Sequence, residues 1–198
     1  MKNLSFPLQF TFKISTFAND FVAKDVNEQT VCYIKQKMFK FIEDVSIYND
    51  ESKTETLYSI KADRWLDFSA AYNFTDHLGN YLGKVARKGW ASIWKARYEI
   101  YDENNIQDLL VQEENAWIKV ADALLMEIPF LAILSGYFLN PSYLVSRPDG
   151  TPVIRLKKEP SFFGRKFSVN KLNEFEKGEE ERVVLGLMMM ILLERRRG

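Results

Sequence analysis

The stretch VVLGLMMMILL, residues Val183–Leu193, holds eleven consecutive positions without a polar side chain, set between Glu179–Glu181 and Arg195–Arg197. Leu and Met favour helices, and acids before the run and arginines after it complement the helix dipole. We therefore predict a helix over residues 179–197. Because it is apolar on every side, this helix must be surrounded by protein or by lipid. A membrane span needs about 20 apolar residues, so we expect burial inside the protein, with insertion at a membrane surface as the alternative.

The composition indicates a single domain with a large core. The chain has 198 residues, of which 46% are hydrophobic and 14% aromatic. Its 27 basic and 27 acidic residues balance, which argues against nucleic-acid binding because that requires a strongly basic surface. Cys32 is the only cysteine, so an internal disulfide is excluded. We expect a cytoplasmic protein, soluble or peripheral to a membrane, without a cofactor, and the sequence leaves its oligomeric state open.

Alternating apolar and polar residues predict β-strands over most of the remaining chain. Phe6–Ile14 places an apolar side chain at every second position, as in a half-buried strand. Arg147–Gly150 combines a proline and a glycine that favour a tight hairpin turn. The segments Tyr72–Ile100 and Tyr143–Val169 weakly repeat one order of strands, turn and basic residues, as in a duplicated half-barrel. Further strands are expected at residues 39–47, 57–62, 64–74, 81–87, 91–101, 130–139, 153–157 and 161–169.

Residues 108–126 follow a different pattern. Leu110, Trp117 and Val120 fall on one helical stripe, and acidic residues occupy the opposite side. Pro129 then prevents a helix from continuing far. We expect a helix here, packed outside the strands as an insertion.

Several short motifs follow one another along the chain: Arg64-Trp65, Tyr72–Asp76, Gly79, Leu82–Val85, Arg87-Lys88, Tyr143–Val145 and Val183–Leu193. In this order they resemble the tubby C-terminal-like superfamily, nearest to its LURP-one-related and phospholipid-scramblase-like branch. The resemblance implies a mainly β fold, a closed antiparallel barrel of about twelve strands around a buried apolar C-terminal helix. Residues 1–198 would form this one domain, with residues 108–126 as a helical insertion and residues 179–197 as the central helix.

Catalytic chemistry finds little support in the sequence. His77, the only histidine, lies in a predicted turn, and Cys32 lies in a predicted strand without a residue that would activate it. One Cys and one His exclude a zinc site, so we expect a protein that is not an enzyme. The alternative is an enzyme or small-molecule carrier, with a pocket between the barrel and the helix at residues 108–126.

Basic residues are the better candidates for binding. They form two groups near the ends of predicted hairpin strands: Lys84, Arg87 and Lys88, then Arg155, Lys157, Lys158, Arg165 and Lys166. If the hairpins lie close together, both groups form one pocket for the phosphate headgroups of anionic phospholipids at a membrane surface. Tubby proteins bind phosphoinositides through basic side chains, which the resemblance extends to this chain by analogy. A protein partner is the second interpretation, and lysines that only keep the outer face soluble are the simplest one.

Overall fold

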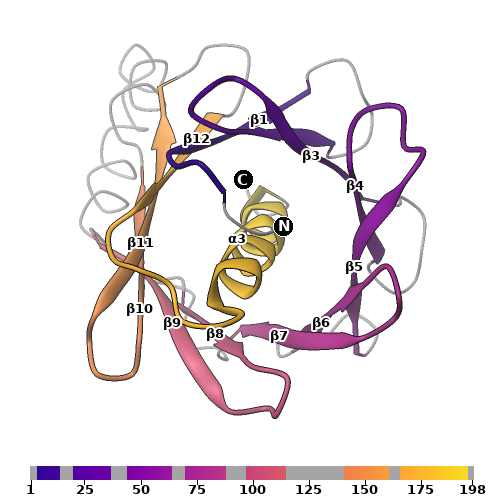
Figure 1. The fold of residues 1–198 in the computed structure, drawn as a ribbon. Coiled ribbons are helices and arrows are strands. Elements are labelled where there is room, and N and C mark those ends of the chain that lie inside the picture. The colour runs from indigo at the N-terminus through magenta and orange to yellow at the C-terminus, as the bar shows by residue number, and fades with distance from the viewer. Residues whose placement is uncertain are drawn as a thin grey trace, which may run out of the picture.

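The computed structural model describes residues 4–13, 20–36, 44–63, 70–87, 97–114, 141–160 and 166–195. In this part of the chain, twelve antiparallel strands close into one barrel, and a helix runs through its interior (Figure 1). Each strand pairs with its neighbours in sequence, and the pairing of β1 with β12 closes the ring. The prediction of a closed antiparallel barrel around a C-terminal helix is confirmed.

The elements are β1 (Leu8–Phe12), β2 (Phe21–Lys24), β3 (Thr30–Gln36), β4 (Asp44–Tyr48), β5 (Thr56–Ala62), β6 (Ala71–Asp76), β7 (Tyr81–Arg87), β8 (Arg97–Tyr101), β9 (Gln107–Glu113), β10 (Ser142–Ser146), β11 (Pro152–Glu159), β12 (Lys166–Lys171) and α3 (Glu179–Arg195). The weak sequence repeat corresponds to β6–β8 and β10–β12, and each of these triplets is a hairpin followed by a third antiparallel strand.

The apolar part of α3 forms the centre of the core. All its residues from Val183 to Leu192 are buried, and so are the inward-facing side chains of the strands, among them Phe10, Phe21 and Phe74. Burial of apolar surface from both the sheet and the helix is the main force that holds them together. In the described residues, no helix combines the length and the apolar character that crossing a bilayer requires.

Two glycines let α3 approach one wall of the barrel, where it contacts β6, β7 and β8. A Cβ atom at Gly186 would lie 2.6 Å from Cδ1 of Ile100 on β8. On β7, Gly83 has a φ of +130°, and a Cβ atom there would overlap the carbonyl oxygen of Tyr101 and lie 3.1 Å from Cδ of Arg182 on the helix. A side chain at Gly186 would push the helix away from β8, and one at Gly83 would disturb the pairing of β7 with β8 and crowd Arg182.

Polar contacts fix the two ends of α3 to the barrel. Near its start, an Nη2 of Arg182 lies 2.6 Å from Oδ2 of Asp108 on β9. Near its end, the hydroxyl of Tyr98 on β8 donates to Oε1 of Glu194 at 2.6 Å. Burial raises the pKa of Tyr98 well above its ordinary value, and the Glu194 carboxylate adds to the shift, so this hydroxyl remains a donor. Because these groups are buried or half-buried, their pairing avoids the large free energy of desolvating an unpaired charge.

Four of the five hairpin turns around the start of α3 share one design. Each begins with an aspartate whose carboxylate accepts a hydrogen bond from the backbone N–H two residues on, and the residue after that has a positive φ. The four aspartates are Asp25, Asp50, Asp76 and Asp102. In the β10–β11 turn, Arg147 stands where the other turns have an aspartate, three residues before Gly150, which has a φ of +90°. Its guanidinium instead donates to both carboxylate oxygens of Glu179, at 2.9 and 2.7 Å, so this turn anchors the helix.

The prediction of a helix over residues 108–126 is wrong for residues 108–113. Asp108–Glu113 belongs to β9, where Leu109 and Val111 alternate into the core. Strand β2 went unpredicted, because three of its four residues are buried and no alternation is visible in so short a segment. Residues 115–126 and the predicted strand at 130–139 lie outside the described residues.

A charge in the middle of α3 tests the burial of the helix. We expect Met189→Asp to lower the free energy of unfolding by about 4 kcal/mol or more, since Met189 is fully buried and a buried unpaired carboxylate is strongly unfavourable. Met189→Leu, which keeps the volume, should lose less than about 1.5 kcal/mol. Urea denaturation of both variants measures the difference. A soluble Met189→Asp protein with an unchanged midpoint would contradict burial of the helix.

The close approach at Gly186 can be tested by a double-mutant cycle. Ala favours helices by about 1 kcal/mol over Gly, but its Cβ would clash with Cδ1 of Ile100. We therefore expect Gly186→Ala to destabilise the wild-type barrel, and to destabilise an Ile100→Val background less, because Cδ1 is removed there while Cγ1 of residue 100 stays 3.1 Å from the new Cβ. Ile154→Val is the control, since Ile154 is equally buried but lies on β11. Equal effects of Gly186→Ala in all three backgrounds would show that the helix does not press on β8.

Candidate functional site

Arg87 and Lys158 lie on the inner side of the barrel wall. Arg87 follows Val85 by two residues and Lys158 follows Leu156 by two, and both apolar side chains are fully buried. Side chains alternate along a strand, so both cations belong to the inner face, near the end of the barrel that surrounds the last turn of α3. The charge of Arg87 acts there on the buried hydroxyl of Tyr98. Neither residue belongs to an outward-facing pocket.

The outward-facing candidates lie on different sides of the barrel. Lys84 is on β7, with its Nζ 5.1 Å from the centre of the Tyr101 ring. Strands β8, β9 and β10 separate it from β11 in the closed sheet. The other described candidates face outward on β11 and β12: Arg155, Lys157 and Lys166. Two candidates lie outside the described residues: Lys88 and Arg165. The described members of the two groups therefore do not form one pocket.

The outer face of β11, β12 and β1 holds the most accessible of these cations. The strand register places Lys157 beside Ser168, and Ser168 beside Gln9 of β1, in one row across three strands. Lys166 lies diagonally next to Lys157, and both lysines are exposed. Neither lysine forms an ion pair with another described residue. Ammonium and amide groups on one surface are hydrogen-bond donors that suit phosphate oxygens.

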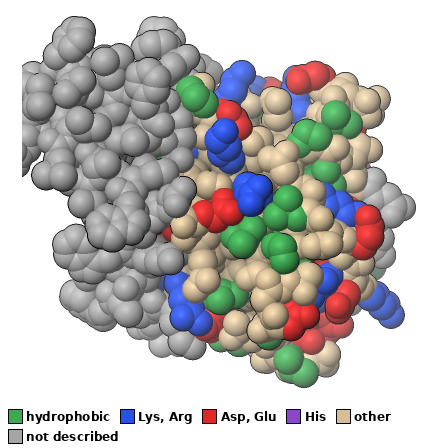
Figure 2. Space-filling view, turned by 90° about the vertical axis from the view of Figure 1, so that its left-hand side faces the viewer, with side chains coloured by type: hydrophobic (Ala, Val, Ile, Leu, Met, Phe, Trp, Pro, Cys, Tyr) green, Lys and Arg blue, Asp and Glu red, His purple; other side chains and the backbone are tan. Residues whose placement is uncertain are grey.

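Acidic side chains offset part of this positive charge. The guanidinium of Arg155 lies 3.0 Å from Oε1 of Glu114, and the hydroxyl of Ser168 donates to Oε1 of Glu159 at 2.7 Å. Among the described residues on the side of the barrel that includes β10 and β11, basic and acidic side chains are interspersed with apolar ones (Figure 2). The face formed by Lys157, Lys166, Ser168 and Gln9 is called the lysine face below.

Cys32 and His77 have ordinary surroundings. Cys32 is fully buried, and burial raises the pKa of its thiol to about 12, so the reactive thiolate is scarce at neutral pH. His77 is exposed in the β6–β7 turn. In the described part of the chain, no group of three or more His, Cys, Asp or Glu side chains is arranged to hold a metal ion.

The comparisons with known proteins agree with this architecture. A model of the LURP-one-related family matches residues 30–170, which extend from β3 into β12 and make up more than half of the chain. No curated protein and no solved structure matches the chain. The family is part of the tubby-like superfamily, whose expected barrel around a C-terminal helix is the fold described above. The chain therefore belongs to the LURP-one-related family.

Proposed function

We propose that this protein is a non-enzymatic binding module that recognises the phosphate headgroups of anionic phospholipids through its lysine face. The observation that carries the proposal is the pair Lys157 and Lys166, exposed on adjacent strands beside the Ser168 hydroxyl. Membership of the LURP-one-related family supports a binding role on a tubby-like barrel.

The arrangement favours weak and reversible binding to a surface. Each lysine near an anionic membrane contributes about 1 kcal/mol, so two lysines bind a single headgroup weakly and a membrane of many headgroups better. Glu159 lies directly across from Lys166 on this face, and Glu114 pairs with Arg155 next to it. These carboxylates weaken the attraction, so only a ligand dense in negative charge should bind. Because the contacts are exposed, salt should screen them strongly.

Liposome sedimentation tests this proposal. We expect the protein to bind phosphatidylcholine vesicles that contain a phosphoinositide, and to lose this binding as sodium chloride rises to about 0.5 M. The double variant Lys157→Gln and Lys166→Gln should bind roughly 30-fold more weakly, which corresponds to about 2 kcal/mol for two lysines.

The matched control is the double variant Lys35→Gln and Lys61→Gln. These lysines lie on β3 and β5 and face the outside of the barrel elsewhere, so the change in net charge is the same. Equal losses in the two double variants would mean that general charge, not the lysine face, attracts the membrane. No salt-sensitive binding to any acidic vesicle would remove the proposal.

A further inference from the structure

The large apolar side chains that are exposed gather at one end of the barrel. In the described residues they are Val26, Leu78, Ile106 and Leu172, with exposed fractions of 53%, 74%, 64% and 37%. The first three lie in hairpin turns and Leu172 follows β12, so all four belong to the end where α3 begins. Val26 and Leu172 lie beside the segment that carries Leu4 and Phe6, whereas Leu78 and Ile106 lie in turns farther round the ring.

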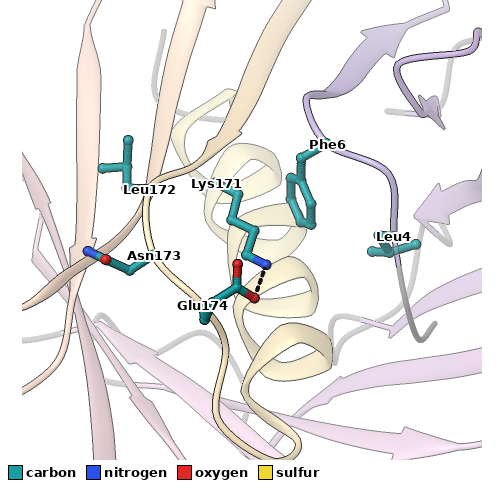
Figure 3. A pocket seen from close by; sticks show the side chains of 6 residues that line it. All are labelled: Leu4, Phe6, Lys171, Leu172, Asn173 and Glu174. Atoms are coloured by element: carbon teal, nitrogen blue, oxygen red, sulfur yellow. Dashed lines mark hydrogen bonds and ion pairs between the residues drawn. The ribbon is translucent and has the colours of Figure 1, made fainter.

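A hollow of about 440 Å³ opens at this end. Figure 3 shows Leu4 and Phe6 on one side of it and the connection from Lys171 to Glu174 on the other. The Phe6 ring packs on Phe175, with 5.5 Å between the ring centres. The hollow is therefore bounded by two chain segments that the fold holds in place.

An exposed apolar residue, Val26, lies next to one wall of the hollow. The backbone N–H of Val26 donates to the carbonyl oxygen of Ser5 at 3.2 Å, which places the half-exposed Val26 side chain next to the segment that carries Leu4 and Phe6. The Leu4 N–H in turn donates to Oε1 of Glu180 at 2.9 Å, so this segment is fixed to the first turn of the helix.

Charge is distributed very unevenly between this end and the remainder of the chain. The five turns, the connection after β12 and the first turn of α3 contain fourteen of the 27 acidic residues and only six of the 27 basic ones. The segments counted are residues 24–29, 49–55, 76–80, 102–106, 147–151 and 171–182. The remainder of the chain has 13 acidic and 21 basic residues. A neutral chain thus has a strongly acidic end, called the acidic end below.

Hydrogen bonds favour the ionised form of two turn carboxylates at this end. Hydrogen bonds from Ser52 lower the pKa of Asp50, and those from Asn80 lower the pKa of Asp76. At the rim of the hollow, Glu174 is 92% exposed and lies 2.6 Å from the Lys171 ammonium. An exposed pair of this kind contributes little to stability, so an incoming cation can take the place of Lys171.

We propose that the acidic end docks a basic segment of a partner protein. An apolar side chain of the partner packs on Phe6 and Leu172 at the rim of the hollow, and a neighbouring Lys or Arg pairs with Glu174. The complementary charges speed association and select against acidic partners. This surface is separate from the lysine face, and like charges repel anionic membranes from it.

A synthetic amphipathic peptide of leucine and lysine tests the docking surface. Its control is an analogue in which glutamate replaces every lysine. We expect the lysine peptide to bind the full-length protein and to shift the methyl NMR signals of Val26 and Leu172. The glutamate analogue should not bind. In the double variant Leu172→Ser and Glu174→Lys, fluorescence anisotropy should show about tenfold weaker binding, since an apolar contact and a charge pair are lost together.

The matched control is the double variant Leu78→Ser and Glu55→Lys, which makes the same chemical changes at the acidic end but away from the hollow. It should weaken binding by no more than about twofold. The proposal would be overturned if the two double variants lost the same amount of affinity for the lysine peptide, or if the glutamate analogue bound as tightly as the lysine peptide. It would also be overturned if phosphatidylserine vesicles shifted the Val26 and Leu172 signals, because the acidic end would then face a membrane.

Discussion

The fold rests on a mutual requirement between the helix and the sheet. A helix that is apolar on all sides is unfavourable in water, and a barrel of twelve strands has an interior that its own side chains do not fill. Placing α3 inside the barrel solves both problems at once. The glycine contacts at Gly186 and Gly83 then decide how closely the two can approach, so neither part is stable in the form seen here without the other.

This requirement restricts where function can lie. The inner face of the sheet is committed to packing on α3, and cations that alternate inward, such as Arg87, are taken into the polar end of the core. What remains for binding is the outer face and the two ends of the barrel. On these surfaces the protein separates its charges, with lysines on β11 and β12 and carboxylates around the start of the helix.

The sequence predicts this fold better than it predicts the site. The apolar run at Val183–Leu193 predicts a buried helix, the alternating patterns predict many strands, and the resemblance to the tubby-like superfamily implies the barrel that joins them. The inward direction of the Arg87 side chain could also be predicted from the sequence, because Arg87 follows the apolar Val85 by two residues on the same strand. By contrast, the row that joins Ser168 to Gln9 depends on the pairing of β12 with β1. Segments so distant in the chain carry no local signal of their contact.

The closure of the ring has a consequence for folding of the protein during its synthesis. The first strand, Leu8–Phe12, finds its second neighbour only in β12, and α3 follows β12. A nascent chain therefore carries an open sheet with an apolar inner face until β12 and α3 have emerged. Such edges and surfaces are prone to association with other chains. The sheet is closed and its inner face covered only when β1, β12 and α3 are present together.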